Sequence, residues 1–201
     1  MNNDFTPLRL QPLGDVLHVS KPRYHYQTGT LYSAAADVMT DFERVLPLEV
    51  SDQLSIDDAL ELMKSQHIRM LIALDAHGVF SGVITAADLM GAKPTAHAEQ
   101  ARVSLNHILV RDVMTKRDQV QVVSIDQVEQ AQVGDIMQTL TRSGQQHLLV
   151  VDETEAGIKR LRGIISASDI SRFLRVSFDV LTQAHSFAEI ERVVSQAMHH
   201  S

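Results

Sequence analysis

The stretch Gly82-Val83-Ile84-Thr85-Ala86-Ala87-Asp88-Leu89 returns later in the chain as Gly163-Ile164-Ile165-Ser166-Ala167-Ser168-Asp169-Ile170. Each copy has a glycine, two β-branched residues, a hydroxyl residue, two small residues and an aspartate in the same order. An apolar run that ends in a hydroxyl residue and continues with helix-compatible residues predicts a strand leading into a helix N-terminus. The hydroxyl and the aspartate three positions later then share one face of the helix. Such a helix start suits a ligand that carries a phosphate and a sugar diol.

A second motif is also repeated. The sequence Asp37-Val38-Met39-Thr40 recurs 75 residues later as Asp112-Val113-Met114-Thr115, whereas the glycine stretch recurs 81 residues later. The extra residues fall in two polar connections, two of them between Thr115 and Val133 and four in the loop at 153–159. Duplicated folds tolerate insertions at such places. The chain therefore contains one structural unit twice.

The two motifs occur in order and in duplicate, with an amphipathic helix and a pair of strands in each copy. In this arrangement the chain resembles a tandem cystathionine-β-synthase (CBS) domain pair, also called a Bateman module, over roughly residues 35–174. The resemblance implies an α+β fold of duplicated β-α-β-β-α units related by pseudo-twofold symmetry. Family members usually pair such modules into a disc-like homodimer. No catalytic or transport domain is recognised in the sequence, so a stand-alone regulatory protein is expected.

The composition argues against several kinds of function and site. Hydrophobic residues make up 44% of the chain, which is enough for a packed core. The net charge of −7 argues against a nucleic-acid-binding surface, which would need a clustered basic face. The absence of cysteine excludes disulfides and thiolate metal sites, and no apolar run approaches the length of a membrane span. We therefore expect a soluble cytoplasmic protein without nucleic-acid or membrane partners.

The predicted domain order follows the repeats. We expect an N-terminal arm at 1–34, the first CBS unit at 35–91, a linker at 92–103, the second unit at 104–175 and a tail at 176–201. Apolar residues at helical spacing predict an amphipathic C-terminal helix in the tail. Because such a helix cannot bury its apolar stripe alone, we expect it to pack on the module or on a partner. The run Tyr24-His25-Tyr26 in the arm is either a ligand or partner contact or an ordinary surface segment.

Hydrophobic periodicity predicts the regular elements of each unit. In the first unit we expect a lead-in helix at 31–39, a strand at 46–50, a helix capped by Ser55, and strands at 70–74 and 79–84. In the second unit we expect a lead-in helix at 105–113, a strand at 120–123, a long connection at 124–132 and a helix containing Ile136, Met137 and Leu140. Two further strands at 148–151 and 161–166 then lead to the second glycine motif.

Asp88 and Asp169 are the main candidate binding residues. A carboxylate can accept hydrogen bonds from neighbouring ribose hydroxyls, and each such charge-assisted bond contributes about 1.5–3 kcal/mol. The alternative is a surface aspartate that is stabilised only by the helix dipole. Thr85 and Ser166 can offer a hydroxyl and a helix-start amide to a phosphate, a role that is compatible with simple N-capping.

The resemblance adds Thr40 and Thr115 to the candidates, because this position faces the nucleotide in the CBS family. The alternative for both residues is a capping or turn hydroxyl that follows a helix. Lys116 and Arg117 come directly after the second motif. They could supply positive charge to a phosphate, or they could be solvated turn residues.

Many CBS domains have a basic residue ahead of the apolar strand that follows the amphipathic helix. The matching positions are Arg69 and Met70 in the first unit and Gln146 and His147 in the second. Arg69 and His147 are therefore the phosphate candidates implied by the resemblance. Met70 and Gln146 depart from the basic pattern, which argues against tight binding of a triphosphate.

We expect the first unit's cleft to combine Arg69 with Thr85 and Asp88. This cleft should bind a phosphate more tightly than the second, where His147 stands in place of a guanidinium. A guanidinium can bind a phosphate through two hydrogen bonds, whereas an imidazole is mostly neutral at pH 7. Binding beside His147 should therefore strengthen as the pH falls towards 6.

The sequence shows no nucleophile elbow, Walker loop or paired acids at catalytic spacing, and its 10 histidines show no metal-ligand spacing. We therefore expect no enzymatic activity, no metal and no cofactor. The leading interpretation is a sensor of adenosine nucleotides (AMP, ADP or ATP, with S-adenosyl compounds as a variant). Ligand binding would change the shape or dimer geometry and so modulate an unknown partner protein. The alternative is a ligand-free scaffold that only dimerises and holds a partner.

Overall fold

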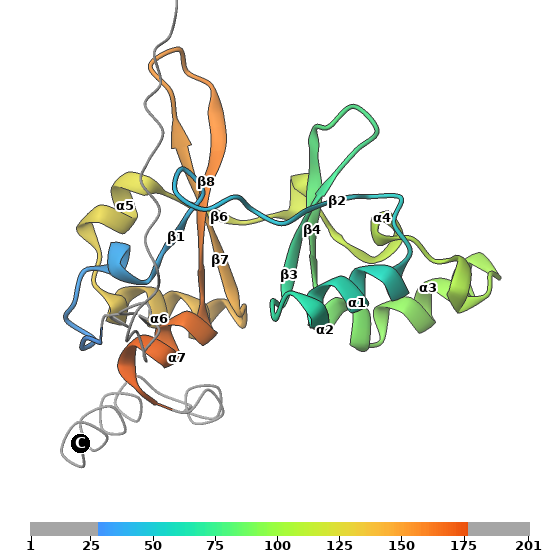
Figure 1. Ribbon diagram of the computed structural model, residues 1–201, viewed down its shortest axis with the longest axis horizontal. Helices are drawn as coiled ribbons and strands as arrows, with labels where there is room; N and C mark the ends of the chain where they lie inside the picture. Colours follow the sequence, from blue (N-terminus) through green and yellow to red (C-terminus); the bar gives the residue numbers. More distant parts are fainter. Residues whose placement is uncertain (1–27, 177–201) are drawn as a thin grey trace, which may run out of the picture.

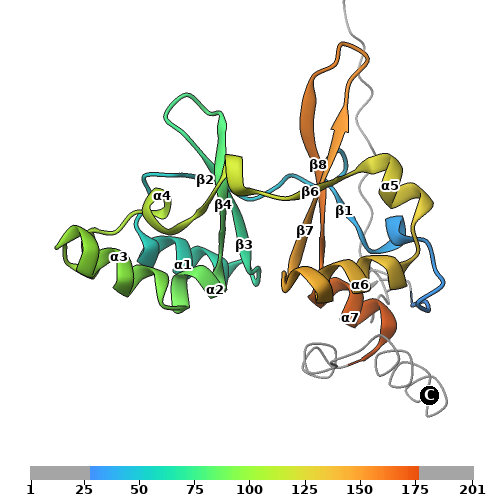
Figure 2. The same cartoon turned by 180° about the vertical axis from the view of Figure 1, so that it is seen from behind.

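The computed structural model describes residues 28–176, which form two similar halves that lie side by side (Figure 1, Figure 2). Each half has a four-stranded sheet with helices packed against it. The predicted α+β class with a duplicated unit is confirmed. The run Tyr24-His25-Tyr26, most of the predicted arm and the predicted C-terminal helix lie outside the described residues.

The first half follows the predicted β-α-β-β-α order. It contains β2 (Glu49–Ser51), α1 (Ile56–Ser65), β3 (Met70–Leu74), β4 (Phe80–Thr85) and α2 (Ala86–Met90). Strands β2 and β3 are parallel because a helix connects them, whereas β3 and β4 form an antiparallel hairpin. The Ser55 side chain caps α1 as predicted, by accepting the Asp58 backbone N–H at 3.1 Å.

The second half repeats this order and adds one helix. It contains β6 (Val122–Ser124), α5 (Ile125–Gln130), α6 (Val133–Ser143), β7 (His147–Glu153), β8 (Lys159–Ser166) and α7 (Ala167–Leu174). Helix α5 lies in the segment that was expected to be a connection. Ser124 and Gln127 form a capping box at its start, and Val128 is buried. A helix this short has too few buried positions to produce a periodic signal in the sequence.

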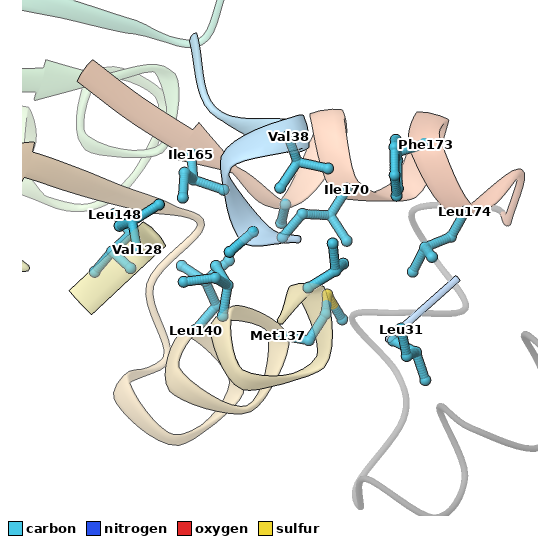
Figure 3. Packing of buried hydrophobic residues seen from close by; sticks show 14 of the residues in the cluster. Leu31, Val38, Val128, Met137, Leu140, Leu148, Ile165, Ile170, Phe173 and Leu174 are labelled. Atoms are coloured by element: carbon cyan, nitrogen blue, oxygen red, sulfur yellow. The ribbon is translucent and has the colours of Figure 1, made fainter. Parts of the chain in front are cut away.

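Each sheet takes its fourth strand from the other half of the chain. β1 (Thr40–Asp41), which begins at the last residue of the first Asp-Val-Met-Thr motif, pairs with β8, and β5 (Thr115–Lys116), which begins at the last residue of the second, pairs with β4. The helices that precede these strands are exchanged too, since η1 (Ala35–Val38) packs in the core of the second half and α4 (Val110–Val113) in that of the first. Figure 3 shows Val38 beside the side chains of β8, α6 and α7. The expectation that each motif enters its own unit is therefore wrong.

The glycines of the repeated stretch permit this exchange. A Cβ atom added at Gly163 would lie 2.5 Å from the backbone carbonyl oxygen of Thr40, and one added at Gly82 would overlap that of Thr115. Glycine in a strand often marks a place where another backbone approaches closely. The glycine of one repeat and the threonine of the other are thus parts of a single packing arrangement.

An ion-pair network holds β1 against β8. The Arg162 guanidinium donates to both carboxylate oxygens of Asp41, at 2.8 and 2.9 Å, and lies 2.9 Å from Glu43. Arg160 donates to Asp152 and Glu43 from the same strand. The hydrogen bond from Arg162 holds the pKa of the Asp41 carboxyl well below its ordinary value. The exchanged strand is therefore fixed by charge as well as by backbone pairing.

The part of the chain that was predicted to be a linker, at 92–103, contains regular structure. It contains α3 (Lys93–Ala101), followed by η2 (Leu105–His107), and η3 (Arg117–Gln119) follows β5. Pro94 is in the first turn of α3, where a proline fits a helix, and it is the buried residue of that helix. The predicted domain boundaries stay predictions. The segment containing α4 and β5 lies after the boundary at 104 in the chain, yet it packs against the first half, which lies before the boundary at 91.

Candidate functional site

Thr85 and Ser166 cap the helices that follow β4 and β8. The Thr85 hydroxyl oxygen accepts the Asp88 backbone N–H at 3.1 Å, and that of Ser166 accepts the Asp169 N–H at 3.0 Å. Each hydroxyl also donates to the aspartate carboxylate, at 2.7 Å to Asp88 and at 2.6 Å to Asp169. The helix starts predicted at both motifs are confirmed. Both carboxylates are held in place at a helix N-terminus.

The other carboxylate oxygen of each aspartate forms an ion pair, and the two pairs differ. Asp88 Oδ1 lies 2.6 Å from Lys93 Nζ on α3, whereas Asp169 Oδ1 lies 3.2 Å from Arg172 one turn along its own helix. The Asp88 side chain is 14% exposed and the Asp169 side chain is 31% exposed. Asp169 is therefore the more accessible of the two carboxylates.

Two clefts lie between the halves, one beside each aspartate. The cleft beside Asp169, here called the Asp169 cleft, has a volume of about 580 Å³. Its polar lining includes Thr40, Arg69, His147, Ser166, Asp169 and Arg172. The cleft beside Asp88, here called the Asp88 cleft, has a volume of about 300 Å³. Its polar lining includes Thr85, Asp88, Thr115, Gln145, Gln146 and His147.

The strand exchange decides which candidates meet. Thr40 joins Ser166 and Asp169 because β1 pairs with β8, and Thr115 joins the Asp88 cleft because β5 pairs with β4. Arg69 lines the Asp169 cleft and is absent from the lining of the Asp88 cleft. Arg69 and Thr85 do line a common hollow beside α1 and α2, but Asp88 is not in its lining, so the expected grouping of all three residues in one cleft is only partly reproduced. Lys116 and Arg117 line neither of these two clefts.

Met70 and His147 lie where the two clefts adjoin, since each lines both of them. The two residues occupy matching positions, because Met70 pairs with Thr85 and His147 pairs with Ser166. Burial lowers the pKa of His147 below its ordinary value of 6.5, although the nearby Asp169 and Asp88 carboxylates oppose this effect. Its imidazole is therefore mostly neutral at pH 7 and borders both clefts.

The Asp169 cleft also has an apolar wall. Part of it comes from the chain between β1 and β2, where Leu46 is 90% exposed and Val45 is 55% exposed. A strand was predicted at 46–50, whereas β2 begins only at Glu49. Neither this wall nor Arg172 was predicted from the sequence to be part of a site. The signal was an apolar run interrupted by Pro47, which is more typical of an exposed segment than of a buried strand.

The described residues contain no cluster of three or more His, Cys, Asp or Glu side chains that could hold a metal ion. Within the same part of the chain, no helix is both long and apolar enough to cross a membrane. The linings of the clefts offer carboxylate, hydroxyl, imidazole and guanidinium groups, and in the Asp169 cleft these lie beside an apolar wall.

Comparison with known proteins agrees with this architecture. The CBS domain family matches residues 35–94 and 110–176. Curated proteins give no match. An uncharacterised conserved protein from Pyrococcus horikoshii has 19% identity and a TM-score of 0.52, over 74% of this chain and 97% of its own. A CBS-domain-containing protein from Agrobacterium tumefaciens has 23% identity and a TM-score of 0.51, over 72% and 95%.

A third structure is that of CBSX2 from Arabidopsis thaliana, solved in complex with AMP. It has 25% identity and a TM-score of 0.49, over 70% of this chain and 94% of its own. The family match covers more than half of the chain in two separate regions, and each region contains one copy of both motifs. The chain therefore belongs to the CBS domain family and is a tandem CBS pair.

Proposed function

We propose that this CBS pair is a regulatory protein that binds an adenosine-containing ligand and thereby modulates a partner protein. The ligand would be AMP, ADP, ATP or an S-adenosyl compound, and the main site would be the Asp169 cleft. The observation that supports this most is a single open cleft of about 580 Å³ that combines a carboxylate, a guanidinium and an apolar wall. A volume of this size is typical of small-molecule sites.

Each part of the ligand has a suitable group in this cleft. Asp169 Oδ1 can accept hydrogen bonds from a ribose diol, in competition with its exposed ion pair to Arg172. Exposed ion pairs contribute about 0–1 kcal/mol, so the competition is weak. The apolar wall at Val45 and Leu46 can cover a base, and the Arg69 guanidinium can bind a phosphate.

A ligand in this cleft would touch both halves of the molecule. The lining of the cleft includes residues from the β1–β2 segment, from the residues just before β3 and from α7. Binding can therefore favour one arrangement of the halves over another, which is the differential affinity that a shape change requires. The regulated partner and a cytoplasmic location stay predictions, as do the absence of nucleic-acid and membrane partners and of catalysis.

Calorimetry on the full chain tests this function. We expect at least one of AMP, ADP, ATP and S-adenosylmethionine to bind, and we expect Asp169→Asn to weaken that binding about tenfold or more, as loss of a charge-assisted hydrogen bond predicts. Asp88→Asn is the matched control, since it makes the same change at the equivalent helix start, and it should have a smaller effect. If none of these ligands binds, the proposal fails and the ligand-free scaffold takes its place.

We also propose that the chain forms a homodimer. Helices α1 and α2 border a hollow whose lining combines apolar residues, among them Leu60, Ile68 and Met90, with polar ones such as Lys64 and Gln146, and Met90 is 68% exposed. Protein interfaces commonly combine an apolar centre with polar groups around it. Light scattering at micromolar concentration should give about twice the chain mass of 22.4 kDa. A mass equal to one chain would rule the dimer out.

A further inference from the structure

The two clefts differ in charge at one pair of matching positions. Because Met70 and His147 occupy equivalent places in their sheets, the residues before them, Arg69 and Gln146, are equivalent as well. The backbone confirms the match, since Arg69 C=O accepts the Ala86 N–H and Gln146 C=O accepts the Ala167 N–H, both at 2.9 Å. Arg69 lines the Asp169 cleft and Gln146 lines the Asp88 cleft, and both residues also line the hollow beside α1 and α2. One cleft therefore has a guanidinium where the other has an amide.

The rest of each lining increases this difference. The Asp169 cleft also has Arg172 and His67 in its lining. Among the described residues that line the Asp88 cleft there is no Lys or Arg, and its polar groups are mainly the amides of Gln119, Gln121, Gln145 and Gln146. Lys93 lies nearby, but its ammonium is bound to Asp88 Oδ1 at 2.6 Å. Arg172 is likewise paired with Asp169, so the two guanidiniums of the Asp169 lining outnumber its one carboxylate by Arg69, whereas the Asp88 lining has a carboxylate and no Lys or Arg.

This difference selects the class of ligand. A phosphate ester carries about 1.5 to 2 negative charges at pH 7 and binds best to a guanidinium, which can donate two parallel hydrogen bonds. Side-chain amides both donate and accept hydrogen bonds, so they suit an uncharged polar ligand. A phosphate in the Asp88 cleft would meet the Asp88 carboxylate without a cation from the lining to offset it. The smaller volume, about 300 Å³ against about 580 Å³, also favours a ligand without a phosphate chain.

We propose that the two clefts bind different classes of ligand. The Asp169 cleft takes a phosphate-bearing adenosine ligand, and the Asp88 cleft takes an uncharged nucleoside. This inference rests on the proposed function, because it assigns ligand classes to the clefts of an adenosine-binding protein. The protein then binds two chemically distinct ligands, one in each cleft, and the His147 imidazole borders both clefts.

Exchanging the two matching residues tests the proposal. Calorimetry on the full parent chain should show one AMP bound per chain, and adenosine should still bind after saturation with AMP. Arg69→Gln should weaken AMP binding about tenfold or more and leave adenosine binding within about twofold, as expected when a guanidinium–phosphate contact is lost. Gln146→Arg, at the equivalent position, should create a second AMP site. Both side chains are exposed, so thermal unfolding curves that match the parent provide the folding control.

The outcomes separate this inference from the function on which it rests. If AMP and adenosine compete for the same site and Arg69→Gln weakens the binding of both equally, the assignment of ligand classes is wrong while adenosine binding stands. If Gln146→Arg gains no AMP site, charge at this position does not select the ligand, and the inference is again wrong. If neither AMP nor adenosine binds the parent, and the wider ligand panel fails as well, the proposed function itself is wrong.

Discussion

Replacing Gly163 with valine will detach β1 from β8 and lower the free energy of unfolding by about 2–3 kcal/mol, the upper range for overpacking a core. A Cβ atom at position 163 would lie 2.5 Å from the Thr40 carbonyl oxygen, a backbone atom that cannot rotate away. The strand must therefore move, and η1, whose Val38 is buried in the second core, must move with it. Because Thr40 lines the Asp169 cleft, ligand binding there should weaken as well.

Urea denaturation of the full chain measures this effect. Lys159→Val is the matched control, since it places the same side chain at the exposed start of the same strand. Exposed substitutions usually change stability by less than about 0.5 kcal/mol. Equal midpoints for Gly163→Val and Lys159→Val would show that the close approach of β1 to β8 does not support the fold.

Replacing Arg162 with alanine should cost about 3 kcal/mol of stability, whereas the same change at Arg160 should cost less. The two arginines belong to one network on one strand but differ in exposure. The Arg162 side chain is 22% exposed and binds Asp41, which is 10% exposed, whereas the Arg160 side chain is 51% exposed. Removing Arg162 leaves the Asp41 carboxylate without its main partner, whereas Asp152, the 9% exposed partner of Arg160, still has Arg162 at 3.5 Å when Arg160 is removed. Urea denaturation of both variants at pH 7 provides the comparison.

The pH dependence of this loss follows from Asp41. Its pKa in the folded protein lies below the ordinary value of 3.8, mainly because Arg162 donates hydrogen bonds to the carboxylate. A depressed pKa adds stability that is complete above the unfolded value and is lost as the pH falls towards the folded one. The deficit of Arg162→Ala relative to the parent should therefore be constant from about pH 5 to 7 and shrink below about pH 4. A deficit unchanged at pH 3.5, or equal deficits for both arginine variants, would contradict this role for Arg162.

Much of the fold could be predicted because its signals are local. Ser55, Thr85 and Ser166 cap helices as their positions next to apolar runs indicated, and β3 matches its predicted bounds. Each of these features depends on a few neighbouring residues, and hydroxyl caps and buried strands leave clear patterns.

The pairing of the exchanged strands could not be predicted in this way. Thr40 is the last residue of a motif that could lie against either Gly82 or Gly163, because both repeats have a glycine at the same position of the strand. A repeated sequence does not say which copy pairs with which. Because β1 pairs with β8, Thr40 lines the same cleft as Asp169. Arg69 also lines that cleft, whereas Asp88 lines the other one. The candidate residues were thus named from local motifs, while their grouping depended on contacts distant in sequence.

The ion pair between Lys93 and Asp88 shows the same limit. Lys93 lies in a segment that was expected to be an irregular linker, and helix α3 brings its ammonium to the Asp88 carboxylate. Asp88 and Asp169 look equivalent in the sequence, yet their exposed fractions are 14% and 31%. Part of the difference between the duplicated sites therefore comes from a segment that is not duplicated.

A crystal structure of the full chain grown with AMP would show which cleft binds the nucleotide and through which groups. We expect AMP in the Asp169 cleft, with its ribose hydroxyls at hydrogen-bond distance from Asp169, its phosphate at Arg69 and its base against the wall that contains Leu46. AMP with its ribose at Asp88 while the Asp169 cleft stays empty, or no bound AMP at a concentration that saturates the protein in solution, would contradict this expectation.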